Sequence, residues 1–322
     1  MPPGMDERRL RVLTWHVHSS YLYYLVHCGH EILLPVRPDR AEGYGGLTGA
    51  FPWAPTVREI PADAVRGTEV DVVLFQSRRN WEVDQHEILS ESQRRGPRVY
   101  VEHDPPREHP TDTRHPVDDP GVLLVHVTHF NALMWDAGRA PVRVIDHGVV
   151  VPPDARYTGE LERGIAVVNG LGWRGRRLGR DVFEAVRERV PLDLIGIHSD
   201  QLGGLGEVVP SEVPRFIARY RFFFHPARYT SLGLAVLEAM AVGLPIVGLA
   251  TTELVTVIRD GVNGYIATDP EALVEPMHRL LADPDHARRL GEEGRRTAES
   301  RFGIERFARD WDAVLREAAG SR

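Results

Sequence analysis

The sequence predicts an α/β protein of two domains, each built on a parallel sheet with helices on both faces. Three observations support this prediction. The 322 residues are more than one ordinary hydrophobic core accommodates. Short runs rich in Val, Ile and Leu alternate with helical stretches, the order that produces parallel sheets. A hydrophobic content of 42% and a charged content of 26% are typical of globular proteins.

The first half of the chain carries six expected strands, with helices between several of them. The strands cover residues 11–15, 31–35, 70–75, 98–101, 122–127 and 142–145. An amphipathic helix is predicted over 81–95, and a long loop rich in Gly, Pro and aromatic residues over 37–56. A second loop, 104–120, contains five prolines. Its stiffness and polarity fit a surface loop as well as a lid or acceptor-site wall, and both interpretations stay open.

The second half repeats the alternation. Strands are expected at 165–168, 192–196, 222–225, 245–248 and 265–267, and helices at 181–189, 211–220, 270–282, 284–301 and 304–319. A further helix is predicted to begin between Thr230 and Gly233. We expect an N-terminal domain over 1–150, joined by the C-terminal helix 304–322, and a second domain over 151–303.

Composition limits the classes of binding partner and the cellular compartment that we expect. A net charge of −7 argues against nucleic acid as the main partner. The sequence contains no run of 18 apolar residues, so no membrane span is expected. Cys28 is the single cysteine and the first residues are polar, which together predict a cytoplasmic protein. Peripheral contact with a membrane stays open. No G-x-G-x-x-G follows the first strand, so a Rossmann dehydrogenase is not expected.

Polar residues follow two strands of the first half, where parallel sheets place ligand loops. His16, His18 and Ser19 follow the first strand, and His103 and Asp104 follow the strand at 98–101. The His-x-His pattern is compatible with a metal ligand pair. No carboxylate or cysteine stands nearby at ligand spacing, so we expect no metal site.

Two loops of the second half are suited to phosphate. Residues 169–179 combine four glycines with Arg174, Arg176 and Arg177, and no acidic residue stands among them, so one or two of these cations are expected to be available to a ligand. A solvated basic turn is the alternative. The helix expected from Thr230 would present backbone amides to an anion. It would also place Glu238 about 12 Å from Thr230, about the length of a nucleoside beyond its diphosphate.

The residues that follow carry a family resemblance. Residues 230–247 read TSLGLAVLEAMAVGLPIV, and 260–266 read DGVNGYI. Both stretches resemble the retaining glycosyltransferases of family 4 (glycosyl transferases group 1), whose patterns are EGFGLxxLEAMAxGxPVV and DGxNGxL. The match covers about 45 residues. It implies the GT-B architecture: two Rossmann-like domains facing each other across a cleft, with the C-terminal helix packed back on the first domain.

The resemblance also implies roles. Glu238 would bind the ribose hydroxyls of a sugar nucleotide, and the arginines after the strand at 165–168 would hold the diphosphate. His103 would lie beside the transferred sugar, with Asp104 or His103 orienting the acceptor hydroxyl. The loop 16–19 would face the diphosphate from the other domain. The backbone at the start of the helix would complete the donor site, through Thr230, Ser231, Leu232, Gly233 and Leu234.

The chain also departs from the family pattern. Thr230 replaces the first Glu of the Glu-x7-Glu pair, which touches the donor sugar. The family's GG-x-P-E segment is replaced by residues 252–256, which begin with Thr252 and Glu253. We hypothesise that Glu253 supplies the missing carboxylate from this neighbouring loop.

The expected function is therefore the retaining, metal-independent transfer of a hexose-type sugar from a nucleoside diphosphate to an acceptor hydroxyl. UDP is favoured over GDP as the nucleotide, although no residue pattern separates uracil from guanine. No other cofactor is expected. The acceptor is a saccharide, a lipid-linked molecule or a small molecule. The alternatives are a nucleotide-sugar epimerase or hydrolase on the same fold, and a non-catalytic nucleotide-sugar-binding protein.

Overall fold

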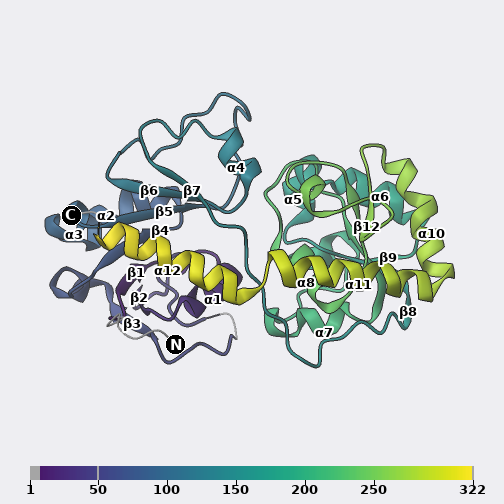
Figure 1. Cartoon of the computed structure of the whole chain (residues 1–322), viewed down its shortest axis with the longest axis horizontal. Helices are drawn as coiled ribbons and strands as arrows, with labels where there is room; N and C mark the ends of the chain where they lie inside the picture. Colours follow the sequence, from purple (N-terminus) through teal and green to yellow (C-terminus); the bar gives the residue numbers. More distant parts are fainter. Residues whose placement is uncertain (1–7, 49–50, 321–322) are drawn as a thin grey trace. The chain divides into compact units, whose positions relative to one another are not determined.

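The computed structural model describes residues 8–48 and 51–320, which form two units. Unit 1 consists of Met1–Val127, Asn131–Asp146 and Ile304–Arg322, and unit 2 of Thr128–Phe130 and His147–Gly303. Each unit is built on one parallel sheet (Figure 1).

Unit 1 contains seven strands in the order β3-β2-β1-β4-β5-β6-β7. The strands are β1 (Arg11–Thr14), β2 (Glu31–Val36), β3 (Val57–Pro61), β4 (Val72–Phe75), β5 (Arg98–Glu102), β6 (Val122–His126) and β7 (Val142–Val144). All neighbours pair in parallel, so every strand ends at the same edge of the sheet. The α-helices are α1 (Ser19–Leu25), α2 (Gln85–Ile88), α3 (Glu91–Arg95), α4 (His129–Met134, whose first two residues group with unit 2) and α12 (Ile304–Gly320).

Alternate residues of these strands face two apolar layers, as expected for a sheet buried on both sides. Leu13, Val73 and Tyr100 belong to the core cluster on one side of the sheet. The long C-terminal helix α12 runs beside α1 (Figure 1). Its Trp311 is fully buried, and the indole Nε1 donates to the Tyr21 hydroxyl at 3.1 Å. The apolar spacing of α12 therefore serves the core of unit 1, as its sequence predicts.

Unit 1 differs from the sequence prediction in one helix and in one additional strand. The helix expected over 81–95 is interrupted at Leu89, which is extended, and Ser90 starts α3 with a capping box to Gln93. A Ser with Gln three residues on is a helix start signal, and here it ends one helix and begins another. Strand β3 was not expected, because its sequence V-R-E-I-P is polar and lies at the sheet edge.

Unit 2 contains five strands in the order β12-β11-β10-β8-β9, again all parallel. The strands are β8 (Leu161–Val167), β9 (Leu192–Ile195), β10 (Tyr220–His225), β11 (Ile246–Leu249) and β12 (Gly264–Ala267). The α-helices are α5 (Leu171–Arg174), α6 (Arg180–Arg187), α7 (Val213–Ile217), α8 (Leu234–Val242), α9 (Leu254–Val257), α10 (Val274–Ala282) and α11 (Pro284–Arg301). The helix expected to reach Tyr220 ends at Ile217, because Tyr220 already belongs to β10.

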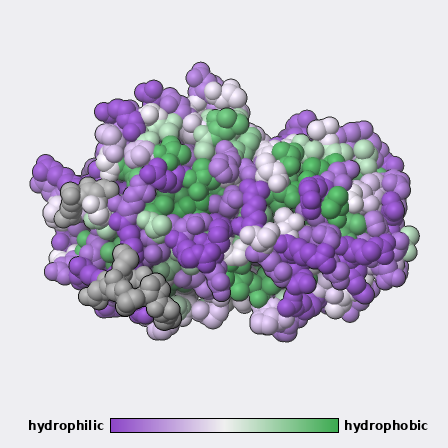
Figure 2. All heavy atoms as spheres, in the orientation of Figure 1, coloured by the Kyte–Doolittle hydropathy of each residue, from purple (hydrophilic) through white to green (hydrophobic). Residues whose placement is uncertain are grey.

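The core of unit 2 places the central strand β10 between two helical layers. Phe222 and Phe224 point to the layer that contains Phe183 and Met277, and all four side chains are buried. On the other side α11 lies against α8, where a Cβ on Gly291 would lie 1.9 Å from the Gly243 carbonyl oxygen. The face shown in Figure 2 is largely hydrophilic, and its apolar groups gather in separate patches. No helix among residues 8–48 and 51–320 is long and apolar enough to cross a membrane.

Candidate functional site

Helix α8 begins later than its sequence predicts. The expected start lay between Thr230 and Gly233, but α8 begins at Leu234, with extended Gly233 as its N-cap. Ser231 and Leu232 lie almost buried in the preceding loop. Gly233 has no side chain to accept from the first-turn amides, and no acidic residue stands in that turn. Such an end is suited to an external anion.

Glu238 lies on the second turn of α8, where its side chain is 8% exposed. Its helical neighbours Leu237 and Ala239 are fully buried. A carboxylate in such apolar surroundings is costly unless polar groups or a ligand compensate it. Because the helix spans only Leu234–Glu238 of the interval, the 12 Å estimated from a helix starting at Thr230 does not apply.

The arginine loop after β8 has an acidic partner that lies just beyond it in the sequence. Arg176 pairs with Asp181 in the first turn of α6 at 2.7 Å. Arg228, from the loop after β10, binds both oxygens of the same carboxylate at 2.5 and 2.8 Å. These guanidinium groups, Arg228 first, hold the pKa of Asp181 below its ordinary value. The local sequence could not show the ion pair between Arg228 and Asp181, because these residues stand 47 positions apart.

Backbone contacts fix the loops after β8 and β10 to each other. The amides of Arg228 and Tyr229 both donate to the Arg177 carbonyl oxygen, at 3.0 and 3.1 Å. Gly179 has φ +79°, and a Cβ there would lie 1.9 Å from the Pro226 carbonyl oxygen. Only glycine permits this approach. Arg174 lies in the same loop, over the ring of the exposed Trp173 at 5.9 Å.

The loop after β11 is held in a strained conformation. Thr252 has φ +50°, which is unusual for a β-branched residue. Thr251 anchors the loop, since its Oγ1 donates to the Ala227 carbonyl oxygen at 3.0 Å. Strain of this kind is found where the surroundings determine the backbone, often at functional sites.

Glu253 is buried and engaged by three groups of unit 2. Its carboxylate accepts from the Phe130 amide at 2.8 Å and from Thr256 Oγ1 at 2.7 Å, and it pairs with Arg301 at 3.1 Å. At 1% exposure, Glu253 offers a sugar hydroxyl almost no accessible surface. The geometry therefore gives Glu253 a structural role in this arrangement. The neighbouring Thr251 and Thr252 are both half-buried.

The carboxyl edge of the sheet in unit 1 brings predicted residues together from two strands. The rings of His18, after β1, and His103, after β5, lie 4.2 Å apart. The Tyr21 ring meets His103 edge-on at 4.6 Å. His103 is half-buried and His18 exposed, so a ligand can approach this cluster from the His18 side.

Asp104 is tied to its own loop. The carboxylate pairs with Arg107 at 2.5 Å, and its backbone oxygen accepts from Trp135 Nε1 at 2.8 Å. Beneath it, the buried His115 of the proline-rich loop lies 3.0 Å from Glu102. Burial lowers the pKa of nearby His126 to about 3, so that ring is neutral. The proline-rich segment is therefore anchored to the sheet rather than only resting on the surface.

His16 and Ser19 form a hydrogen-bonded pair in the same edge region of unit 1. His16 Nε2 lies 2.7 Å from Ser19 Oγ, and His16 Nδ1 lies 2.5 Å from the Gly46 carbonyl oxygen. Burial lowers the pKa of His16. This connection between the loop after β1 and the long loop 37–56 was not expected from the sequence.

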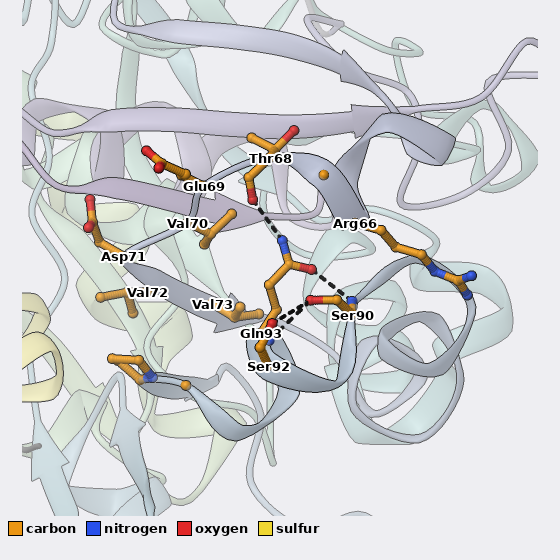
Figure 3. Close-up of a pocket in the computed structure, with 13 residues that line it drawn as sticks. Arg66, Thr68, Glu69, Val70, Asp71, Val72, Val73, Ser90, Ser92 and Gln93 are labelled. Atoms are coloured by element: carbon orange, nitrogen blue, oxygen red, sulfur yellow. Dashed lines mark hydrogen bonds between the residues drawn. The ribbon is translucent and has the colours of Figure 1, made fainter.

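A cavity of about 280 Å³ in unit 1 lies at the opposite, amino-terminal ends of β4 and β5. Figure 3 shows Gln93 crossing it to the Thr68 carbonyl oxygen, with Ser90 in the capping box of α3. Ligands of parallel sheets bind at the carboxyl ends of strands. This cavity lies at the amino-terminal edge of the sheet, and polar groups of its wall are hydrogen-bonded to one another. For both reasons we do not assign the donor site to it.

Two further groups at the edge of unit 2 escaped the sequence analysis. Arg228 was passed over within the motif stretch, although an arginine in the loop that follows a buried strand could have signalled it. His225 ends β10, and burial lowers its pKa to about 4, so its ring is neutral.

A known protein family matches part of unit 2. Residues 198–297 match the family model described as Glycosyl transferases group 1. Spore coat protein SA of Bacillus subtilis (strain 168) is 36% identical over 105 residues, which cover 31% of this chain and 28% of that protein. The chain thus spans under a third of this relative.

Solved structures match over nearly the whole chain. Sucrose-phosphate synthase from Thermosynechococcus elongatus superposes with a TM-score of 0.68 at 16% identity, covering 98% of this chain and 100% of that one. Anabaena HepE in complex with UDP gives 0.66 at 15% identity, covering 98% and 100%. At such identity the likeness shows the fold. The predicted GT-B class and the resemblance to group 1 glycosyltransferases are both confirmed.

Proposed function

We propose that this chain, which carries a group 1 glycosyl transferase segment on a GT-B fold, is a glycosyltransferase that moves a hexose-type sugar from a nucleoside diphosphate to a hydroxyl acceptor. One observation carries the proposal. The group 1 segment includes α8, whose N-terminus lacks a side-chain cap, with Glu238 one turn further along the helix. Amides and a carboxylate at this spacing suit a diphosphate and the ribose beyond it.

The donor would lie along the carboxyl edge of unit 2. The amides around Gly233 and Leu234, with Thr230, Ser231 and Leu232 before them, would face the diphosphate. Positive charge would be added by Arg174, Arg176 and Arg177. Of these, Arg176 also forms an ion pair with Asp181. Glu238 would accept from the ribose hydroxyls. UDP is the preferred nucleotide of this proposal, and the UDP complex of HepE, a protein of the same fold, supports that choice.

The chemistry would be stabilisation of the leaving diphosphate. Transfer with retention passes through an oxocarbenium-like state, in which the bond to the diphosphate is largely broken. Preorganised amides and guanidinium groups stabilise the charge that develops on the leaving oxygen. These groups make a metal unnecessary in the proposed mechanism. His103 would lie beside the transferred sugar, and His103 or Asp104 would orient the acceptor hydroxyl.

Thr230 and Glu253 favour one alternative. The first Glu of the family pattern is absent at Thr230, and the carboxylate of Glu253 is engaged by three groups. A protein that binds nucleotide sugars without transferring them would tolerate both features. An epimerase or hydrolase on the same fold would instead convert the donor with no acceptor present.

A thermal-shift panel of UDP, GDP, ADP and their sugars tests the proposal, since a ligand that binds the folded state raises its apparent stability. We expect the largest shift with UDP or a UDP-sugar, and no shift with any nucleotide contradicts the proposal. Donor conversion without acceptor identifies the epimerase or hydrolase. Binding with no turnover against any saccharide, lipid-linked or small-molecule acceptor identifies the non-catalytic protein.

A further inference from the structure

The hydrogen bonds of His16 determine which of its ring nitrogens carries the proton. The Gly46 carbonyl oxygen can only accept, so the contact at 2.5 Å places the hydrogen on Nδ1. Burial lowers the pKa of His16, which keeps the ring neutral at pH 7. His16 Nε2 is therefore an acceptor, and Ser19 Oγ, 2.7 Å away, is its donor.

This assignment decides what Ser19 can bind. Its single hydrogen is committed to His16, so only the lone pairs of Oγ remain for a ligand. Such an oxygen binds an O–H or N–H donor. It does not suit a phosphate oxygen, which itself accepts. The side chain of Ser19, half-buried at the start of α1, is thus better suited to a sugar hydroxyl than to a diphosphate.

A group of aromatic rings reaches this pair through Trp53. Tyr23 stands one turn after Ser19 on α1 and hence on the same helix face. Its ring stacks on Phe51 at 4.8 Å with an interplanar angle of 18°. Trp53 meets the His16 ring at 5.6 Å, and its indole Nε1 donates to the Thr48 carbonyl oxygen, which fixes the ring. Tyr23, Phe51 and Trp53, the aromatic group, are all half-buried and so retain exposed surface.

The charge of this region favours a neutral ligand. Arg37 pairs with Glu87 at 2.5 Å, and Arg40 pairs with Glu59 at 2.8 Å. The cations of the described part of the loop 37–56 are therefore neutralised. An anionic headgroup would find aromatic surface here but no uncommitted arginine of that loop. Aromatic surface with a few oriented polar groups is typical of sites for small neutral molecules.

We propose that Ser19 and the aromatic group form an acceptor subsite for a neutral hexopyranoside. A sugar hydroxyl donates to Ser19 Oγ, and the C–H face of the ring lies against Tyr23, Phe51 and Trp53. His16 is a positioning residue that acts through Ser19. The subsite rests on the proposed transferase function, and it makes a saccharide the acceptor class.

The test is direct binding to the full chain. Methyl glycosides of glucose, galactose and mannose are titrated while tryptophan fluorescence is followed, with UDP titrated separately. We expect saturable binding of at least one glycoside, weakened about tenfold by Ser19→Ala, the loss of one hydrogen bond. Ser19→Ala leaves the affinity for UDP unchanged. If it weakens UDP binding and spares the glycosides, the loop faces the diphosphate and the proposal is wrong.

Variants of the aromatic group separate binding from folding. Trp53→Ala and, as a second variant, Tyr23→Leu should abolish glycoside binding. Trp173→Ala, which removes an exposed tryptophan of unit 2, should leave it intact. Unfolding curves establish that each variant is folded. Binding to phosphatidylglycerol vesicles with no response to any glycoside would overturn the proposal in favour of a lipid surface.

Nitrogen-15 NMR of the imidazole rings tests the positioning role. We expect the Nδ1–H tautomer for His16 in the wild type, with its Nε2 resonance shifted by Ser19→Ala. An Nε2–H tautomer would overturn the assignment of Ser19 as donor. The outcomes also separate the two proposals. Glycoside binding without any nucleotide binding leaves the subsite standing while the transferase function fails.

Discussion

The carboxyl edges of the two sheets are built from different chemistry. In unit 2 the edge combines a helix N-terminus without a side-chain cap, glycine turns and a network in which Arg176 and Arg228 share Asp181. In unit 1 the same edge carries imidazole and aromatic rings, including His16 and His103. One edge offers amides and positive charge, and the other offers imidazole and aromatic rings and the oriented hydroxyl of Ser19.

This difference indicates that the two units bind different substrates. Anions are bound by backbone amides, which are neutral donors, and by guanidinium groups, which keep their charge at every physiological pH. Neutral acceptors need apolar surface and few polar contacts. We infer that unit 2 is responsible for donor affinity and unit 1 for acceptor recognition and turnover. Single substitutions should therefore affect one property and spare the other.

His103→Ala tests this inference with the largest expected effect. We expect turnover to fall about 100- to 10,000-fold, as when a residue that orients or deprotonates a hydroxyl is lost. Affinity for UDP should stay within about twofold, because the proposed donor site consists of groups of unit 2. His109→Ala, an exposed histidine of the proline-rich loop, is the matched control. Equal loss of turnover and UDP affinity would contradict this inference.

Glu253→Ala tests whether the carboxylate of Glu253 binds the donor sugar or has a structural role. The substitution leaves Arg301 and the Phe130 amide without their shared partner. We expect the free energy of unfolding to fall by about 3–5 kcal/mol, as for a broken buried ion pair. Chemical denaturation measures it. Glu271→Ala breaks the exposed pair with Arg189 and should cost less than about 1 kcal/mol.

Glu253→Gln completes this test, because it keeps the shape of the side chain and removes its charge. Unchanged turnover and donor binding in this variant would remove the hypothesis that Glu253 replaces the missing sugar-binding carboxylate. A stable Glu253→Ala variant that had lost only turnover would support that hypothesis instead.

Regular elements were more predictable than the contacts between loops. Strand β10 and the apolar stripe of α12 were recognisable, because burial repeats with the period of each element. The start of α8 was misplaced, because Thr230 and Ser231 favour N-caps but here belong to the preceding loop. The ion pair of Asp181 with Arg228 could not be predicted, because it joins α6 to the loop after β10, and these come together only when β8 and β10 pair.

Glu238→Ala tests whether the ribose of the nucleotide binds to unit 2. Losing a carboxylate that accepts from ribose hydroxyls should weaken UDP binding about 10- to 100-fold, the value of a charge-assisted hydrogen bond or two. Isothermal titration with UDP measures the loss. Glu184→Ala, which removes an exposed carboxylate of α6 paired with Arg180, is the control and should bind UDP normally. Unchanged UDP affinity in Glu238→Ala would place the ribose elsewhere.

Asp181 should give unit 2 a pH-dependent contribution to stability. Its pKa is lowered in the folded state, so its ion pairs stabilise the protein above the unfolded pKa and are lost as the pH falls through the folded one. Asp181→Asn should therefore lower stability at pH 7 by about 1 kcal/mol or less, since the pair is partly exposed. The difference from wild type should shrink below about pH 4. A constant difference down to pH 2 would exclude this linkage.

Thr252→Gly is expected to have the smallest effect on stability and the most informative one on turnover. Relief of the positive φ should gain about 1 kcal/mol, and the added freedom of glycine in the unfolded chain should cancel about 0.5–1 kcal/mol of it. The melting temperature should therefore hardly move. Thr251→Gly, which loses the bond to the Ala227 carbonyl oxygen, should lower it. If the strain of Thr252 serves the donor site, Thr252→Gly lowers turnover at unchanged stability. Full activity would instead show that the strain is only a consequence of the anchoring of Glu253 and Thr251 on either side.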